Sequence, residues 1–212
     1  CVIFIFANVS ANDYYFFDNF ESYQTNSSLF SRWIPQYSPL LSMVYDNSKK
    51  VYVDCFAEHL GDRDIHFELN NTNFSSIIFD KLKASWDFKV RECNPTWKET
   101  LKISPQGSSF YAYYKDENNF ISVEFKVNAA NQSCGSGEAQ IAGFQRKNGV
   151  TETIIPYTTY QFLMNKTISP SVSLINNADN KTNISISVDG NLEISSIFNY
   201  SLKNPGKILF EC

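Results

Sequence analysis

The stretch that most constrains the fold is residues 109–127, in which two runs rich in aromatic and β-branched residues flank a polar turn. Between Ile121 and Val127, apolar residues alternate with Ser, Glu and Lys, so a strand here would bury one face and expose the other. The turn at residues 115–119 joins the two runs into a hairpin. A single hairpin is not stable in water, so we expect the remaining chain to supply neighbouring strands and a second sheet.

Short apolar stretches separated by turns continue through the chain, and no segment has convincing helical periodicity beyond two turns. Asn148 and Gly149 form a typical tight hairpin turn, because both positions need positive φ. The chain has 212 residues, of which 43% are hydrophobic, so it suits one all-β sandwich domain, placed at residues 12–212. The other predicted strands are 14–20, 41–45, 50–54, 77–79, 85–92, 139–146, 150–155, 159–165, 171–175, 183–188, 192–194 and 206–212.

The first eleven residues have a different character. Residues 1–7 are an unbroken apolar run that is too short to cross a bilayer. Small residues follow at Val9 and Ala11, the two positions that signal peptidase reads. We therefore interpret residues 1–11 as the remnant of a secretory signal peptide, with an N-terminal strand as the alternative. No other apolar run in this segment is long enough for a transmembrane helix.

The cysteines fit an exported protein. Beyond Cys1, the even set of Cys55, Cys93, Cys134 and Cys212 allows three disulfide pairings. If the strands before Cys93 and Cys134 flank the first strand of the central hairpin, both cysteines lie at the same edge of the sheet. We therefore favour Cys93–Cys134, which leaves Cys55–Cys212. A free buried thiol is the alternative, and it is less typical of secreted proteins.

Sequons for N-glycosylation also indicate a secreted protein or the extracellular face of a membrane. Asn183 further reports which way its strand faces. If it holds a sugar, Ser185 and Ser187 also face out, and Ile184 and Ile186 face the core. The candidate glycosylation sites are Asn26, Asn70, Asn73, Asn131, Asn165, Asn180, Asn183 and Asn199.

Several short motifs stand along the chain: DNFESY at 18–23 with Trp33 after it, DENNFISV at 116–123, QRKNGV at 145–150, VDG at 188–190 and GKI at 206–208. They occur in the order found in laminin-G-like domains of the concanavalin-A-like lectin/glucanase superfamily, which the chain resembles. The resemblance implies two packed antiparallel sheets in jelly-roll topology. It also implies a structural calcium near the first and last strands, for which the candidate ligands are Asp13, Asp18, Glu21 and Glu211. No other cofactor is expected.

Composition and motifs exclude several functions. The net charge of −4 and the lack of a Lys/Arg run argue against a nucleic-acid partner. Glu124, Glu138, Glu193 and Glu211 each stand alone, whereas glycosidases of this superfamily place their carboxylates together on one strand. No C-x-x-C motif, no histidine pair with metal-ligand spacing and no nucleophile elbow is present, and we interpret His59 and His66 as ordinary loop residues. A catalytic function is therefore the less favoured reading.

Charged residues at alternate positions favour a binding face instead. If Trp86 is buried, Asp87, Lys89 and Arg91 form a charged row on the exposed face of the sheet. Glu124 and Lys126 would form a second row nearby on the same sheet. Such rows suit sugar hydroxyls when a tyrosine ring stacks on the pyranose, and Tyr111 and Tyr113 supply such a ring unless the parity is reversed and they point into the core. Opposite charges that simply pair across strands are the plainer alternative. The candidate residues for carbohydrate binding are Asp87, Lys89, Arg91, Tyr111, Tyr113, Glu124 and Lys126.

The function predicted from the sequence is therefore a secreted or surface glycoprotein module that recognises a glycan or an extracellular protein without catalysis. The first alternative is a carbohydrate-active enzyme of the same fold, either a glycoside hydrolase or a polysaccharide lyase. The second alternative is a purely structural extracellular module.

Overall fold

The computed structural model describes the strands of the chain and the short turns between many of them. Among these residues no helix is long and apolar enough to cross a membrane. The described residues are 3–9, 12–18, 31–35, 43–45, 51–53, 66–70, 79–89, 106–127, 136–163, 166–199 and 207–211.

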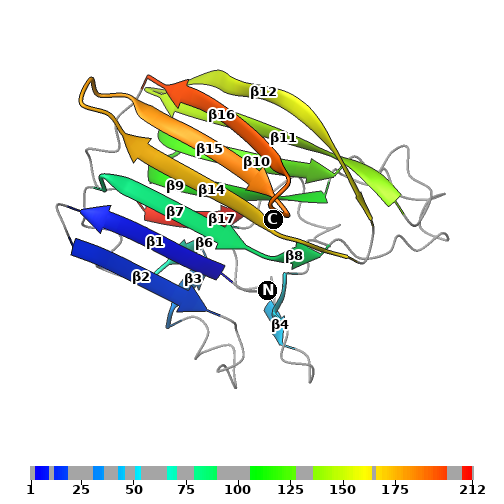
Figure 1. The fold of residues 1–212 in the computed structure, drawn as a ribbon. Coiled ribbons are helices and arrows are strands. Elements are labelled where there is room, and N and C mark those ends of the chain that lie inside the picture. The colour runs from blue at the N-terminus through cyan, green and yellow to red at the C-terminus, as the bar shows by residue number, and fades with distance from the viewer. Residues whose placement is uncertain are drawn as a thin grey trace.

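Two antiparallel sheets form two layers, as the alternating sequence pattern predicted (Figure 1). The sheet that faces the viewer in Figure 1 has six strands. In spatial order they are β16 (Leu192–Phe198), β15 (Thr182–Val188), β14 (Pro170–Asn176), β7 (Lys81–Trp86), β1 (Ile3–Val9) and β2 (Asn12–Asp18). Every neighbouring pair in this sheet is antiparallel.

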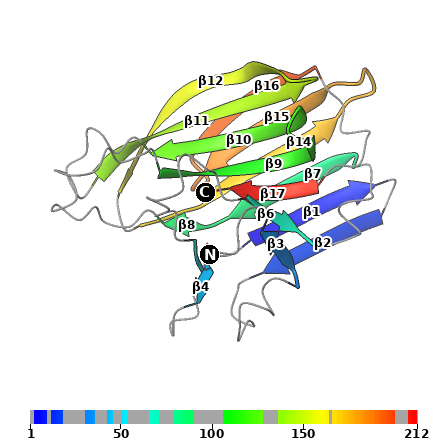
Figure 2. The ribbon, with the colours of Figure 1, turned by 180° about the vertical axis from the view of Figure 1, so that it is seen from behind.

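The second layer is a seven-stranded sheet, which faces the viewer in Figure 2. Its order is β12 (Val150–Leu163), β11 (Ser136–Lys147), β10 (Asn119–Val127), β9 (Gln106–Asp116), β17 (Lys207–Glu211), β6 (His66–Leu69) and β3 (Trp33–Pro35). Two small ribbons accompany the sheets, β13 (Thr167–Ile168) with β8 (Phe88–Lys89), and β4 (Met43–Tyr45) with β5 (Val51–Val53). The central hairpin of the sequence is β9–β10.

The core lies between the two sheets and is built from alternate residues of their strands. In β15 the burial alternates, with Ile184 and Ile186 inside and Asn183 and Ser185 exposed, which confirms the predicted parity. Trp86 of one sheet packs on the other, with its ring 5.5 Å from Phe110 and 5.4 Å from Phe125. Burial of side chains of this size stabilises the fold by roughly 1.5–3 kcal/mol each.

Strand β12 is longer than the sequence pattern suggested. Two strands, 150–155 and 159–165, were predicted on either side of Pro156, but the structure has one strand through Val150–Leu163. Because β12 is the edge strand of its sheet, Pro156 needs no ladder partner for the amide hydrogen that it lacks. A proline can therefore stand inside this strand without ending it.

The apolar N-terminal segment forms strand β1, which was the alternative to a signal-peptide remnant. It lies between β7 and β2 and pairs with both. Ile5 is completely buried in the core. Cleavage after residue 11 stays a prediction, and it would remove a strand from the interior of the six-stranded sheet.

The strand predicted at 85–92 is placed differently by the structure. Strand β7 begins earlier, at Lys81, belongs to the six-stranded sheet and has β14 and β1 as neighbours. The neighbours of β9 are β10 and β17. The geometric premise for the Cys93–Cys134 bridge is therefore wrong, because the strand before Cys93 does not flank β9. Cys55, Cys93, Cys134 and Cys212 lie outside the described residues, so their pairing stays a prediction.

Half of the candidate glycosylation sites fall on described residues. Asn70, Asn180, Asn183 and Asn199 are all exposed. Sugar attachment at these positions stays a prediction, and exposure is the condition it requires. Asn26, Asn73, Asn131 and Asn165 lie outside the described residues.

Candidate binding face on the seven-stranded sheet

A bulge in β9 decides which aromatic residues can form a site. Ile121 pairs with Tyr113, but the next residue of β10, Ser122, pairs with Tyr111, so Ala112 is skipped. The extra residue shifts the alternation of β9 by one. As a result, Tyr113 joins the core, whereas Tyr111 lies on the opposite face of the sheet, which points away from the six-stranded sheet. Tyr113 therefore takes the core placement that was the alternative, and of the two candidate tyrosines only Tyr111 lies on the outward face.

Aromatic rings cluster on this outward face of the seven-stranded sheet. The ring of Phe120 lies 5.2 Å from Tyr111 and 6.2 Å from Tyr114, with which it stacks. A second pair joins Phe144 and Tyr157 at 5.9 Å, edge to face, and Tyr157 is 48% exposed. We call the face defined by these five residues the aromatic face. Offset and edge-to-face ring pairs stabilise one another by about 0.5–1.5 kcal/mol, so the rings are held in a fixed arrangement, in which Tyr111 is buried and Tyr157 is the most exposed.

A row of polar residues crosses the sheet beside these rings. By backbone register, Glu124 of β10 pairs with Ser109 of β9, Ser109 pairs with Glu211 of β17, and Glu211 pairs with His66 of β6. We call these four residues the polar row. Neighbouring members stand one strand apart, which is about 4.8 Å. Lys126 lies two residues beyond Glu124 on β10 and pairs with Gly107, which places it in the next row.

The polar row could not be found from the sequence, where its members belonged to different interpretations. Glu124 was a sugar-binding candidate, Glu211 a calcium candidate and His66 a loop residue. They share a row because β17 is inserted between β9 and β6, although more than a hundred residues separate it in sequence from β6. The alternation of residues along a strand predicts which face of the sheet each side chain lies on. Only the order of the strands determines which residues of that face are neighbours in a row.

Two neighbouring hairpin turns close one end of the aromatic face. The backbone N–H of Gly149 donates to Asn118 O at 3.0 Å, and that of Asn148 donates to Asn119 Oδ1 at 3.1 Å. Asn148 and Gly149 have φ of +51° and +80°, as the Asn-Gly signal predicted. The side chain of Asn119 and the backbone of Asn118 donate to Asp116, and these bonds lower the pKa of its carboxyl group.

The charged row predicted around Trp86 lies elsewhere. Asp87 stands at the break between β7 and β8, where Ser169 Oγ donates to its Oδ1 at 2.8 Å. Lys89 is in the small β8–β13 ribbon, and Arg91 lies outside the described residues. The expectation that this row lies on the same sheet as Glu124 and Lys126 is therefore wrong.

Asp87 belongs instead to a chain of polar contacts at the end of the six-stranded sheet. Asp189 accepts hydrogen bonds from the Ser169 backbone at 2.8 Å and from the Tyr160 hydroxyl at 2.5 Å. Burial, together with this bond and the negative charge of Asp189, raises the pKa of Tyr160 to about 12. Asp189 itself occupies the tight β15–β16 turn, at φ +51°. These contacts tie three loops together.

The predicted calcium ligands are not brought together where the structure describes them. Asp18 is buried, and its Oδ2 accepts a hydrogen bond from the Trp33 indole at 2.9 Å. Asp13 lies five residues away on β2, about 17 Å along the strand. Glu211 is in the other sheet, and Glu21 lies outside the described residues. In the described ranges no three His, Cys, Asp or Glu side chains are grouped as metal ligands would be.

No protein-family model matches the chain, and no curated protein sequence matches it. Among solved structures, it is similar to the carbohydrate recognition domain of Emp46p. The metal-free form has a TM-score of 0.49 at 11% identity, with 92% of this chain and 86% of that chain covered. The potassium-bound form has a TM-score of 0.49 at 10% identity with the same coverage. A tyrosine-to-phenylalanine mutant has a TM-score of 0.40 at 12% identity, covering 92% and 93%. Similarity at this level does not identify a site, so the binding face described above stands on the residues of this chain.

Proposed function

We propose that the chain is a non-catalytic extracellular recognition module, a concanavalin-A-like sandwich that binds a glycan on its aromatic face. The observation that supports this is the juxtaposition, on one face of the sheet, of the polar row with the ring cluster, in which Tyr157 is exposed and Tyr111 is buried. Aromatic rings stack on the apolar face of a pyranose, and carboxylates and hydroxyls hydrogen-bond to its rim. We also propose that the sandwich is of the laminin-G-like subtype. An extracellular protein is the alternative to a glycan as the binding partner.

The extracellular setting is supported by the sequons and by the even set of cysteines. Asn70, Asn180, Asn183 and Asn199 are exposed, so each is accessible to a glycan. A mass measurement before and after enzymatic removal of N-glycans tests this, together with peptide mapping of the cysteines without reduction. Unmodified asparagines and free thiols in protein from a secretory host would contradict it.

The experiment for the binding function is a screen of glycans and polysaccharides, with calcium and with a calcium chelator. Tyr157→Ala removes the most exposed ring of the cluster, and Glu124→Gln replaces a carboxylate of the polar row with an amide of the same size. Each is expected to weaken binding about five- to thirtyfold, since about 1–2 kcal/mol is typical of such contacts. Val150→Ala, at a residue of the same strand as Tyr157 that is 72% exposed, is the matched control.

Two outcomes contradict the proposal. If no ligand in the screen binds, the purely structural module is favoured. If a ligand binds but neither Tyr157→Ala nor Glu124→Gln changes its affinity, the site is not the aromatic face. Loss of binding on calcium removal alone would support a structural calcium, for which the donors would have to be found beyond Asp18.

The polar row also supports a second candidate, a carbohydrate-active enzyme. Glu124 and Glu211 stand in one row, two strands apart, with their Cα atoms about 10 Å from each other. Inverting glycosidases need their carboxyl groups roughly 6.5–9.5 Å apart. Release of reducing ends from a bound polysaccharide, abolished by Glu124→Gln with binding retained, would establish this activity. The absence of any release over long incubation would leave recognition as the function.

A further inference from the structure

The outward face of the six-stranded sheet holds a second, unrelated set of side chains, which we call the serine face. Buried Leu82 and Ala84 alternate with exposed Lys81 and Lys83 on β7, and the same parity continues across the sheet. Its rows, read by register, are Phe17–Phe4–Ser85–Ser171–Ser187, then Tyr15–Phe6–Lys83–Ser173–Ser185–Ser195, and Asn8–Lys81–Ile175–Asn183–Ile197. These rows place hydroxyl groups at regular spacings in the middle of the sheet.

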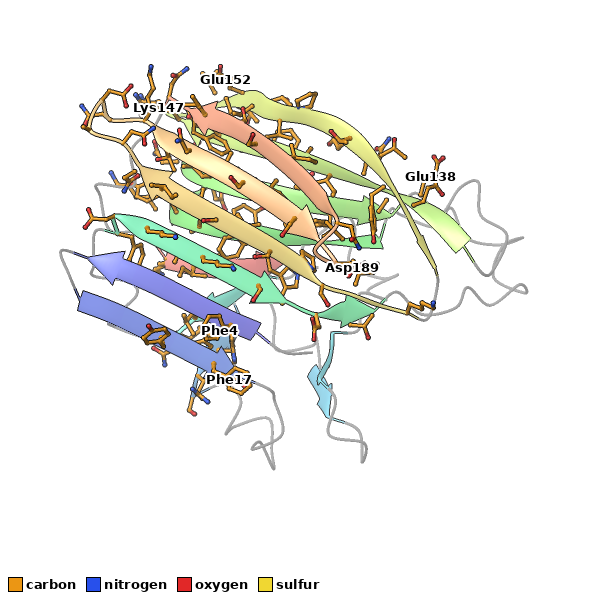
Figure 3. All side chains as sticks on the ribbon, in the orientation of Figure 1. Phe4, Phe17, Glu138, Lys147, Glu152 and Asp189 are labelled. Carbon is orange, nitrogen blue, oxygen red and sulfur yellow. The ribbon has the colours of Figure 1, made fainter. Side chains whose placement is uncertain are left out.

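Aromatic residues occupy the β1–β2 side of this face (Figure 3). Tyr15 is 62% exposed and Phe17 is 54% exposed. The rings of Phe4 and Tyr15 lie 6.3 Å apart at 45°. Large exposed rings gathered on one face of a folded protein mark a surface that binds something.

Positive charge adjoins these rings. Lys83 pairs in register with Phe6, and Lys81 lies one step along on the same strand. Neither lysine has an ion-pair partner among the described residues. The acidic positions of the face stand at its margins by register, Asp13 opposite Asn8 and Glu193 opposite Ser187. The whole chain has a net charge of −4, so the two lysines beside these rings form a local positive patch.

From this arrangement we infer that the serine face binds an acidic polysaccharide, with its rings stacked on sugars near Tyr15 and Phe17 and its anionic groups paired with Lys81 and Lys83. The serine hydroxyls both donate and accept, so they match the hydroxyl groups of a chain of sugars. A lipid surface is less suitable, because burying rows of hydroxyls against acyl chains leaves them without hydrogen bonds. This site is separate from the aromatic face, since the two faces belong to different sheets.

The probe is polygalacturonate, with an uncharged glucan of similar length for comparison, and binding is measured to the full chain as secreted and to its Asn183→Gln variant. Asn183 lies in the Lys81 row, so Asn183→Gln keeps a sugar from covering the face without adding a negative charge there. We expect binding to polygalacturonate that weakens with added salt. The double variant K81Q/K83Q should weaken it roughly three- to tenfold, and Phe17→Ser should do so to a similar extent.

The matched controls are Lys115→Gln, an exposed lysine near the end of β9, and Tyr157→Ala on the aromatic face. Both should leave polygalacturonate binding unchanged, whatever they do to ligands of the aromatic face. Three results would overturn the inference. The first is equal binding of the uncharged glucan, and the second is an unchanged affinity of K81Q/K83Q for polygalacturonate. The third is a Phe17→Ser variant that still binds polygalacturonate but loses its binding to anionic phospholipid vesicles or its self-association in sedimentation.

Discussion

The indole N–H of Trp33 donates to the Oδ2 atom of Asp18 at 2.9 Å, and both side chains are buried. Trp33 belongs to β3 and Asp18 ends β2, so this bond connects the edges of the two sheets. Arg32 completes the contact, with Nη1 3.9 Å from the same carboxylate and its guanidinium 5.0 Å from the centre of the Phe16 ring. Phe16 packs edge to face on Trp33 at 5.5 Å.

Replacing Asp18 tests whether this contact holds the two sheets together at that edge. Asp18→Ala removes the acceptor of a buried donor and should lower the free energy of unfolding by about 1–3 kcal/mol, measured by urea denaturation. Asp18→Asn keeps an acceptor oxygen and should cost less. The control is Asp179→Ala, which breaks the exposed Lys181–Asp179 pair (3.3 Å) and should change stability by less than about 1 kcal/mol. Equal effects of Asp18→Ala and Asp179→Ala would refute the role of the bond.

The role of the N-terminal strand is tested by Ile5→Ala. Ile5 is completely buried between the sheets, so removing its side chain should reduce the free energy of unfolding by about 2–5 kcal/mol. The measurement is urea or thermal unfolding of protein whose N-terminus has been confirmed by mass spectrometry. A mature protein whose N-terminus is found at Asn12, with the same stability whether or not its precursor carries Ile5→Ala, would show that β1 is removed in the cell.

The interlocked hairpin turns are tested by alanine at two glycines. Gly149 and Gly190 have φ of +80° and +71°, so an alanine at either is strained by roughly 1–2 kcal/mol. A Cβ at Gly149 would also meet Asn118 Oδ1 at 3.3 Å, whereas a Cβ at Gly190 meets nothing within 4 Å. Gly149→Ala should therefore be the more destabilising of the two in thermal unfolding. If Gly190→Ala is instead the more destabilising variant, the contact between the two turns does not contribute to stability.

Titration of Tyr160 tests the polar contacts around Asp189. The pKa of Tyr160 is raised from 10.0 to about 12, with burial as the largest cause, so folding favours the neutral phenol. Its contribution to stability is complete below pH 10 and is lost as pH rises from 10 to about 12. Absorbance of the phenolate, taken as the difference between the native chain and Tyr160→Phe, measures this pKa.

Asp189→Asn separates the causes of that shift. It removes the negative charge beside the phenol, so the pKa of Tyr160 should fall but stay above 10, because burial is unchanged. A pKa at the ordinary value in the native protein, or one that Asp189→Asn leaves untouched, would contradict the arrangement.

Local features of the fold could be predicted from the sequence, because they depend on periods of two and on turn chemistry. The inside and outside residues of β15, the β9–β10 hairpin and the positive φ values of Asn148 and Gly149 all followed from neighbouring residues. The pairing of β1 did not, because an apolar run has the same pattern in a buried strand and in a signal peptide.

The candidate site was predictable only in part, because it depends on the order of strands and on a bulge. Glu124 and Tyr111 were identified on one face, but the bulge at Ala112 moved Tyr113 to the other. Nothing in the alternation of β9 marks that extra residue. The partners of Glu124 in the polar row come from β17 and β6, whose neighbours are set by pairing between distant segments.

The position of β17 also determines when the seven-stranded sheet can form. Strands β6 and β3 reach β9 only through residues 207–211, although they are synthesised more than a hundred residues earlier. On the ribosome, the hairpins β9–β10 and β11–β12 can assemble first, while β6 has an exposed edge until β17 emerges. Such distant pairing is slow to form, so newly made chains are most prone to aggregation during this interval.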